Sequence, residues 1–495
     1  MNHTYYIHRP GKFKIDDITF SDLDMDRVFS KIDHTVSSVG EEILYSYLRN
    51  PCLNVDEIEK REQSISLYTS NEACRNDSRK ALKNLSKLKK YSVFEYLFHL
   101  DEVECISVFK RYQALILLFI GILLIFINPI IGILATVIIY FYNTFRYFKL
   151  KNEISPYYIC LSYISKAVKC GQKIPVSNKE NLLNVSFLAN ASFLLGNLSG
   201  ETIHGGSGNP IDLIIDIIKM GFHIDIIRFY SLIERVRKNQ DSFEAFLVEL
   251  GTIDASISIF ELRNSLDYYS VPVFASDNNI KISMAVHPLL NDCVSNDIET
   301  SRSVLITGSN ASGKSTFLRT LAINMILAQG INTTFSQGYS APFFKVVSAM
   351  SVKDDLLSGE SYYMAEIKAL KRILDQRTHS DDILVCSFVD EVLNGTNTIE
   401  RIAASSCILK CLSSFGICFG ATHDLELTSI LKDSYTNYHF SEDISSDDIQ
   451  FSYKLKEGPS QSTNAIKLLG KLDYPNEIIQ GALDMVNNYS LTQKW

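Results

Sequence analysis

The sequence predicts an α + α/β protein, in which a mainly helical region precedes an α/β domain with a largely parallel sheet. Three observations predict this fold class. Before Pro272, apolar residues recur at the three- and four-residue spacing of helices. After Pro272, short β-branched and apolar runs, such as 303–307 and 383–389, alternate with helical patterns. An uncharged apolar run at 112–145 interrupts the helical region. We place the domain boundary near residue 270.

Composition narrows the classes of function. A chain of 495 residues is long enough for two to four domains. A net charge of −8 gives no bulk attraction to the phosphate backbone of nucleic acids. The ten cysteines include no C-x-x-C pair, which argues against a zinc ribbon or a disulfide framework and favours reduced thiols in a cytosolic setting. Residues 1–12 contain no apolar segment of a secretory signal peptide.

The helical region begins with residues 1–105, where Pro51 ends an amphipathic run. We interpret the basic segment that follows as a solvated helix face. Its charged residues are Arg79, Lys80, Lys83, Lys87, Lys89 and Lys90. Residues 152–270 return to a helical pattern and complete this region.

The apolar run 112–145 is long enough to span a bilayer, for which about 20 residues suffice. Asn128-Pro129 breaks it near the middle, so it predicts either one kinked helix or a hairpin of two short helices. Basic residues flank both ends, and positive charge marks the cytoplasmic side of a membrane protein. This pattern favours the hairpin, whose arms of about 15 residues would reach roughly 22 Å and would thin the bilayer or dip into it. A buried hairpin in a soluble core is the alternative.

A glycine-rich loop follows the strand-like run 303–307 and precedes a helical pattern that continues to Ala328. In this strand–loop–helix context, G-x-x-x-x-G-K-S predicts a site for ATP phosphates, which bind to backbone N–H groups and to the helix N-terminus. Lys314 should reach the β- and γ-phosphates, and Ser315 should bind Mg²⁺. The loop consists of Gly308, Ser309, Asn310, Ala311, Ser312, Gly313, Lys314 and Ser315.

Two further strand ends carry candidate catalytic residues. The buried-strand run 383–389 ends in Asp390 and Glu391. Asp390 is placed to hold Mg²⁺, and Glu391 to orient or deprotonate the attacking water. The run 416–421 ends in Thr422 and His423, and this imidazole is a candidate sensor of the γ-phosphate.

These motifs resemble those of the MutS mismatch-repair family. Thr307 to Thr316 is similar to the family's phosphate loop, which adds Thr316 to the nucleotide-binding residues. The segment 354–366 resembles its signature segment, 390–398 its Walker B region, and Ala421-Thr422-His423 its switch histidine. Val286-His287-Pro288-Leu289 is similar to the element that opens the family's ATPase domain, which makes His287 a candidate nucleotide contact. The likeness covers about residues 20–105 and 245–490.

The resemblance implies an ABC-type ATPase that hydrolyses ATP with Mg²⁺ and forms a homodimer, in which Ser361 completes the partner's site in trans. It also implies a helical core and lever region in 1–105 and 152–270, an ATPase domain at 271–440 and a helical dimerisation segment at 441–495. The chain departs from the family in two ways: we expect no mismatch-reading N-terminal domain, and the apolar run 112–145 lies in the shortened clamp region.

Three functions therefore remain open. The first is an ATPase held at a membrane by 112–145, with its ATPase domain in the cytoplasm, which moves its helical arms or an unidentified protein partner. The second is a mismatch-repair-type protein that binds DNA. The third is an ABC transporter ATPase, suggested by Leu357-Ser358-Gly359-Glu360 and ranked last because one apolar segment cannot form a transport pathway.

Overall fold

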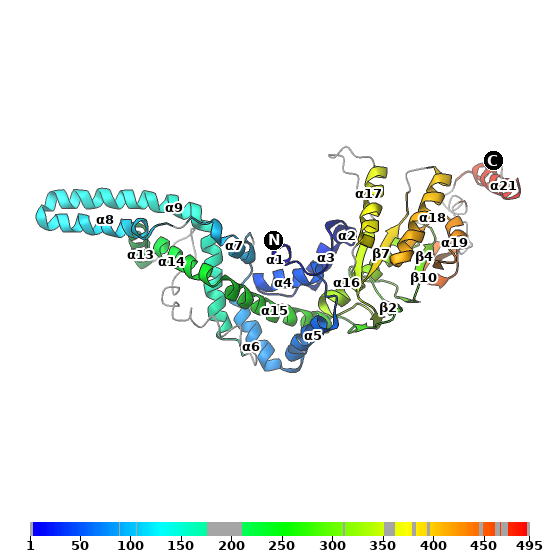
Figure 1. Cartoon of the computed structure of the whole chain (residues 1–495), viewed down its shortest axis with the longest axis horizontal. Helices are drawn as coiled ribbons and strands as arrows, with labels where there is room; N and C mark the ends of the chain where they lie inside the picture. Colours follow the sequence, from blue (N-terminus) through cyan, green and yellow to red (C-terminus); the bar gives the residue numbers. More distant parts are fainter. Residues whose placement is uncertain are drawn as a thin grey trace. The chain divides into compact units, whose positions relative to one another are not determined.

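A computed structural model confirms the mixed helical and α/β architecture and contains two sheets. It describes residues 3–88, 90–104, 106–175, 210–309, 312–350, 362–378, 383–393, 397–444, 449–460, 466 and 474–492. The chain divides into two compact units (Figure 1). The helical unit comprises 1–14, 32–52 and 56–265, and the sheet unit comprises 15–31, 53–55 and 266–495.

The elements of the helical unit are α1 (Tyr5–His8), α4 (Ser38–Arg49), α5 (Val55–Ser70), α6 (Glu72–Lys83), α7 (Val93–Phe98), η1 (Leu100–Glu102), α8 (Val108–Ile127), α9 (Pro129–Gly171), α13 (Pro210–Phe222), α14 (Ile224–Lys238) and α15 (Gln240–Ser265). In this unit, α4, α6, α7, α9 and α14 pack against the long helix α15, and α8 and α13 pack against α9.

The apolar run forms an antiparallel hairpin of α8 and α9, as the basic flanks had favoured, and not the alternative of a single kinked helix (Figure 1). The chain turns at Asn128, which is extended, and its side chain accepts a hydrogen bond from Ile131 N at 3.2 Å. Pro129 then takes the first position of α9, where its missing N–H costs nothing. Because α9 continues to Gly171, it runs through the boundary predicted at 152.

The two arms approach each other closely because glycines lie between them. A Cβ atom on Gly132 would lie 2.3 Å from the backbone nitrogen of Ile125, and one on Gly121 would lie 2.9 Å from Thr136 Oγ1. Such small-residue contacts are common between helices in membranes. At the base of the hairpin, the buried Asn143 donates to Ala114 O at 3.1 Å and to Gly221 O at 3.0 Å.

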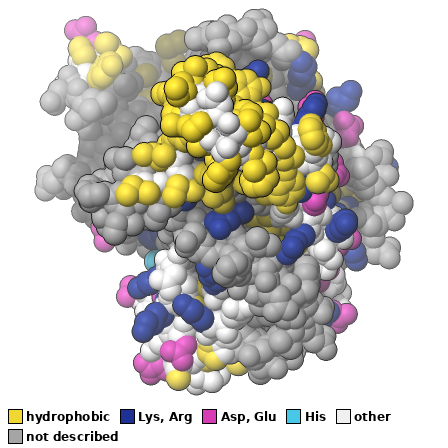
Figure 2. All heavy atoms as spheres, turned by 90° about the vertical axis from the view of Figure 1, so that its left-hand side faces the viewer, with side chains coloured by type: hydrophobic (Ala, Val, Ile, Leu, Met, Phe, Trp, Pro, Cys, Tyr) yellow, Lys and Arg dark blue, Asp and Glu magenta, His cyan; other side chains and the backbone are white. Residues whose placement is uncertain are grey.

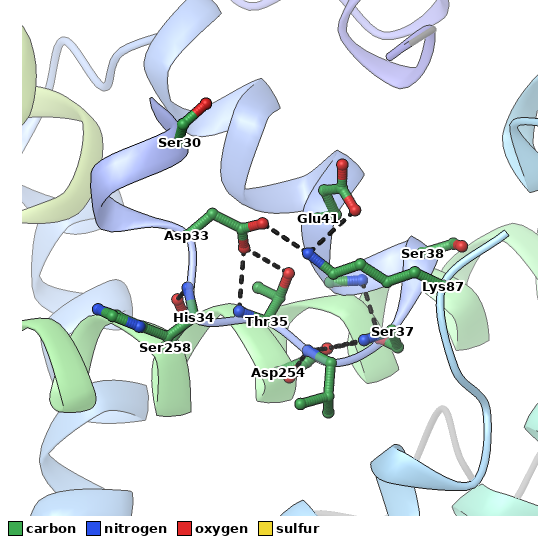
Figure 3. A network of polar contacts seen from close by, with 12 residues as sticks. Ser30, Asp33, His34, Thr35, Ser37, Ser38, Glu41, Lys87, Asp254 and Ser258 are labelled. Atoms are coloured by element: carbon green, nitrogen blue, oxygen red, sulfur yellow. Dashed lines mark hydrogen bonds and ion pairs between the residues drawn. The ribbon is translucent and has the colours of Figure 1, made fainter. Parts of the chain in front are cut away.

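A buried polar network joins the start of α4 to α15 (Figure 3). Asp254 on α15 has no exposed surface and accepts hydrogen bonds from Ser37 N at 2.8 Å and Ser37 Oγ at 2.5 Å. Burial raises the pKa of Asp254 to about 6, while these hydrogen bonds favour its ionised form. Lys87 Nζ links Asp33 and Glu41 at 2.5 and 3.0 Å. The network fixes the turn 33–37 against α15.

The sheet unit contains two sheets. The smaller has the strand order β1-β5-β2-β3, and the larger has the order β10-β9-β4-β8-β7-β6. Its elements are α2 (Asp17–Asp22), α3 (Met25–Ile32), β1 (Val273–Phe274), β2 (Ile280–Ala285), β3 (Asn296–Thr300), β4 (Ser303–Thr307), α16 (Lys314–Ile331), β5 (Gly338–Ala341), β6 (Phe344–Ala349), α17 (Tyr362–Asp375), η2 (Gln376–Thr378), β7 (Leu384–Asp390), α18 (Thr398–Phe415), β8 (Gly416–Thr422), α19 (Glu426–Ile430), β9 (Tyr435–Ile444), β10 (Ile449–Glu457) and α21 (Asn476–Thr492).

The larger sheet is parallel from β6 to β9, and β10 is added antiparallel to β9. The prediction that 441–495 is helical was therefore wrong for 449–457. The sequence there alternates apolar and polar residues, which is the pattern of a half-buried strand. The alternating residues are Ile449, Gln450, Phe451, Ser452, Tyr453, Lys454, Leu455 and Lys456. The described helix of this segment is α21.

Residues 15–31 belong to the sheet unit, although we had assigned 1–105 to the helical region. The cause is a set of polar contacts between α2 and the end of β6. Ser348 Oγ donates to Asp22 Oδ2 at 2.8 Å, and Met350 N donates to the same oxygen at 2.9 Å. Thr19 Oγ1 accepts from Ser348 N at 3.0 Å. These partners are more than three hundred residues away in the chain, so periodicity in the sequence could not reveal them.

Candidate nucleotide-binding site

Three neighbouring parallel strands of the larger sheet bring the predicted site residues to one edge. Thr307, the last residue of β4, pairs with Thr422 at the end of β8. Asp390, the last residue of β7, pairs with Ala421 of β8. The glycine-rich loop, Glu391 and His423 each follow one of these strand ends. The carboxyl edge of a parallel α/β sheet is the usual place for a ligand site.

The loop between β4 and α16 has a backbone that requires glycine at both ends. Gly308 has φ +146° and Gly313 has φ +103°, which L side chains rarely adopt. A Cβ atom on Gly308 would also lie 2.8 Å from Ser312 Oγ, and one on Gly313 would lie 3.2 Å from Tyr453 Cδ1. Positive φ angles of this kind are common in loops whose backbone N–H groups bind phosphate.

Lys314 is almost completely buried, with 2% of its surface exposed. Its Nζ donates to the carbonyl oxygens of Gly308 and Ser309, both at 2.8 Å. The side chain therefore folds back toward the start of the loop and places its charge beside Gly308 and Ser309. A buried ammonium group beside a glycine-rich loop forms an anion site.

His423 lies between Lys314 and Glu391. Its Nε2 is 3.3 Å from Lys314 Nζ and 2.8 Å from Glu391 Oε1. One ring nitrogen cannot accept from the lysine and donate to the carboxylate at the same time. Nε2 therefore bonds to one of the two neighbours at a time, and the histidine tautomer decides which one.

The backbone at Glu391 is strained. Glu391 and Leu393 have φ values of +52° and +59°, and neither is glycine. Such conformations cost on the order of 1–3 kcal/mol each and occur often at functional sites. Glu391 N donates to Ala421 O at 2.9 Å, which ties this bend to the end of β8. The bend turns the Glu391 side chain toward His423.

Asp390 is suited to bind a cation. Burial raises the pKa of its carboxyl group, against the opposing effects of the Ser315 hydroxyl and the Lys314 charge. Within the described part of the chain, its buried Oδ1 has no hydrogen-bond partner. A buried carboxylate oxygen without a donor is costly unless a cation or water satisfies it. Ser315 and Asp390 therefore fit the pair of oxygen ligands expected for Mg²⁺.

Asn310, Ala311 and Ser361 fall outside the described residues. Thr316 is in the first turn of α16, where its carbonyl accepts from Thr320 Oγ1 at 2.8 Å. His287 is buried, and its Nδ1 accepts from Leu289 N at 3.2 Å.

Burial lowers the pKa of His287 to about 4, so its ring is neutral at pH 7. The charged groups that act on this ring are Arg319, Asp24, Arg27 and Lys31, which differ from the groups around Lys314. A direct contact of His287 with nucleotide stays a prediction.

The structure adds two groups that the sequence did not indicate. The Tyr453 ring on β10 packs against Gly313. The alternation of apolar and polar residues in 449–456 could have predicted the strand that carries this ring. Arg401 on α18 forms a two-point ion pair with Asp424, at 2.9 and 2.6 Å, and so holds the residue that follows His423. A charged pair separated by a strand and a helix leaves no signal in a single sequence.

Comparison with known proteins finds a family that is similar to part of the sheet unit. Residues 304–490 match the family model for MutS domain V. This part of the sheet unit is therefore similar to MutS domain V. The match includes the glycine-rich loop, the Asp390-Glu391 pair and His423, which the geometry brings together.

Three individual proteins that are similar to this chain have the same family name. The chain is 30% identical over 265 residues to the DNA mismatch repair protein MutS of Pseudothermotoga lettingae, covering 49% of this chain and 32% of that protein. It is 26% identical over 292 residues to the MutS of Staphylococcus epidermidis, covering 56% and 33%, and 25% identical over 287 residues to that of Listeria welshimeri, covering 54% and 32%. The matches thus span about a third of the length of these relatives.

Proposed function

We propose that this chain is a MutS-like ATPase that is held at a membrane by the α8–α9 hairpin. The observation that carries the ATPase part is the convergence of Lys314, Glu391 and His423 beside the half-buried Asp390 at one edge of a parallel sheet. The domain V match across the same residues supports it.

Each residue has a chemical task in this proposal. The loop amides and Lys314 hold the ATP phosphates, and Ser315 with Asp390 holds Mg²⁺. The Mg²⁺ ion, when bound, neutralises charge that develops on the phosphates. Glu391 accepts a proton from the attacking water, and its hydrogen bond to His423 sets its direction. His423, next to Lys314, reports the state of the γ-phosphate to the end of β8.

The hairpin supports the membrane part. Its tip exposes large apolar side chains, with Phe126 83% exposed and Ile127 and Ile130 both 81% exposed. Figure 2 shows apolar side chains gathered over the end of the helical unit. By length and composition, α8 and α9 are the helices of the described part that are able to cross a membrane.

Charge at the base of the hairpin supports one direction of insertion. Lys110 at the start of α8 and Lys149 on α9 are exposed on either side of the apolar stretch. Arg111 instead pairs with Glu234 of α14, which anchors α8 to the helical unit. Two basic flanks on one face favour insertion of the tip from the cytoplasmic side. The ATPase would then work in the cytoplasm.

Dimerisation is the third part of the proposal and rests on the family likeness. In a homodimer, Ser361 of each chain would approach the nucleotide held by the loop of the other chain. ATP binding would close the pair and move the helical unit, in the manner of switches that respond to a γ-phosphate. What the motion acts on, a protein partner or the bilayer itself, is the open part of the function.

The names of the relatives favour a second candidate, binding of mismatched or branched DNA. Phosphate contacts make such binding steeply dependent on salt. A titration with homoduplex, mismatched and four-way DNA at about 50 mM salt separates the two candidates. Tight, salt-dependent binding supports the DNA function, and absence of binding leaves the membrane ATPase.

The direct test of the nucleotide site compares two lysine substitutions. We expect Lys314→Ala to abolish ATP binding, whereas Lys410→Ala, at an exposed position of α18, should leave it unchanged. Binding of a fluorescent ATP analogue with and without Mg²⁺ measures both. Equal affinity of the two variants would exclude the site.

A further inference from the structure

A second cluster of metal-binding side chains lies in the helical unit, where the proposed ATPase function gives them no role. His8 ends α1, Glu95 lies on α7, and His99 directly follows that helix. One ligand atom from each of the three residues lies within 4.8 Å of the others. His8 Nε2 is 3.1 Å from Glu95 Oε2.

The helix places two of these groups together. Glu95 and His99 are four residues apart, so they share one face of α7 and its C-terminal end. The start of α7 is fixed because Ser92 Oγ accepts from Glu95 N at 3.1 Å. The third group, His8, is oriented by ring contacts with Phe98 and His99, at centroid distances of 4.5 and 5.4 Å.

The His99 ring also has the second contact typical of a metal ligand. Its Nδ1 lies 2.7 Å from the carbonyl oxygen of Glu95. Since a carbonyl only accepts, Nδ1 carries the proton and the lone pair is on Nε2. Metal-bound histidines usually donate their other ring nitrogen to a carbonyl or carboxylate in this way.

Nearby charge does not oppose a cation. Arg9 follows His8 in the chain, but its guanidinium is turned to Glu244 with two hydrogen bonds of 2.7 Å each. The cluster therefore brings one carboxylate and two imidazoles together while the adjacent cation is neutralised. All three ligands are half-buried, so an ion can reach them from solvent.

We propose that His8, Glu95 and His99 bind a divalent transition-metal ion, with Zn²⁺ as the best fit. Imidazole ligands select zinc-like ions, whereas Mg²⁺ and Ca²⁺ prefer oxygen ligands. Two histidines and one glutamate leave a fourth tetrahedral position for water or for another donor. The site is independent of the nucleotide site, whose ligands are oxygens.

The ion ties the N-terminal helix to α7. α1 has four residues, and no side-chain hydrogen bond caps its N-terminus. A helix of this length is unstable by itself. A metal bridge from His8 to Glu95 and His99 would close a loop of more than eighty residues and hold α1 in place.

The test measures Zn²⁺ binding to the full-length protein in detergent after metal removal. Cys407 is exposed and Cys411 lies one helical turn away on α18, so both are replaced by serine to remove a competing thiol site. Isothermal titration with ZnCl₂ should give one equivalent bound per chain. Titration with Co²⁺ should give an absorption band of tetrahedral nitrogen and oxygen ligation.

Substitutions of the three proposed ligands test whether they form the metal site. His8→Ala and His99→Ala should each weaken Zn²⁺ binding at least tenfold and abolish the Co²⁺ band, while His34→Ala should change neither. Unfolding curves without metal show whether each variant is folded, and Glu95→Gln provides a milder second test at the same site. Unchanged binding in the His8→Ala/His99→Ala double variant, or no binding by the parent at micromolar Zn²⁺, would overturn the proposal.

Discussion

Two apolar helices of this chain, α16 and α8, differ in how many of their side chains are buried. In α16, every residue from Thr320 to Ile331 is buried within the sheet unit. In α8, only Arg111, Ala114, Leu118 and Gly121 are buried, and large side chains such as Phe119 and Phe126 are exposed. Both helices are rich in leucine and isoleucine, so composition alone does not distinguish them.

The difference lies in what covers the apolar surface. Burial of apolar area stabilises by about 25 cal/mol per Å², and α16 receives this stabilisation from its own protein. The exposed face of α8 receives none from the described part of the helical unit. Large contiguous apolar patches on a protein mark a binding surface. The comparison therefore predicts that α16 supports folding, whereas the outer face of α8 and α9 supports membrane binding.

The largest effect should come from charges placed at the hairpin tip. Replacement of Phe126, Ile130 and Leu134 by lysine puts three exposed side chains in conflict with lipid. Each lysine costs about 2.5 kcal/mol or more at the centre of a bilayer. Flotation with liposomes should show loss of binding, with ATP binding intact. Lysines at Gln63, Ser66 and Ser70 add the same charge to another face and should leave flotation unchanged.

A second prediction compares the loss of a buried side chain of α16 with the loss of an exposed side chain of α8. Leu321→Ala on α16 should lower the free energy of unfolding of the sheet unit by about 2–5 kcal/mol, because it leaves a cavity where no surface is exposed. Phe126→Ala removes a larger side chain, yet its effect in detergent should stay within about 0.5 kcal/mol. Chemical denaturation measures both. Equal destabilisation would mean that the α8 tip is packed inside the protein.

A buried carboxyl group in the helical unit should give a pH effect of intermediate size. Burial raises the pKa of Glu42 from 4.5 to about 7. Because the folded state holds this proton more tightly than the unfolded state, the contribution of Glu42 destabilises the fold as pH rises from 4.5 to 7. Between pH 4.5 and 7, the free energy of unfolding of Glu42→Gln should therefore rise by about 3 kcal/mol relative to that of the parent protein. A constant difference between pH 4.5 and 7 would contradict the assignment.

The smallest effect should come from the Arg401–Asp424 pair. Arg401→Lys keeps the charge but loses the two-point hydrogen bonding that holds the residue after His423. We expect a severalfold decrease in the rate of ATP hydrolysis with unchanged ATP affinity, because only the position of His423 is disturbed. Steady-state kinetics separates the two quantities. A loss of affinity alone would assign the pair to nucleotide binding.

The sequence predicted the parts that local chemistry determines. The predicted glycine-rich loop follows β4, with positive φ angles at Gly308 and Gly313, and Asp390, Glu391 and His423 lie at the ends of parallel strands at one edge. The turn at Asn128-Pro129 was also local, and the basic flanks of the apolar run had favoured the hairpin over a kinked helix.

Contacts between residues far apart in the chain could not be predicted from the sequence. Asp22 binds Ser348, and this pairing moves residues 15–31 into the sheet unit. The Arg401–Asp424 pair depends on how α18 packs beside β8. In contrast, β10 was missed although its alternation was visible, because the family likeness suggested a helix there.

The central claim is that the sheet unit hydrolyses ATP by using Glu391 as the base. Single-turnover hydrolysis by Glu391→Gln, with Glu477→Gln as an exposed control, tests it most directly. We predict that Glu391→Gln binds ATP as the parent protein does but retains it uncleaved, while the control hydrolyses it at the parental rate. Hydrolysis by Glu391→Gln at that same rate would contradict the account.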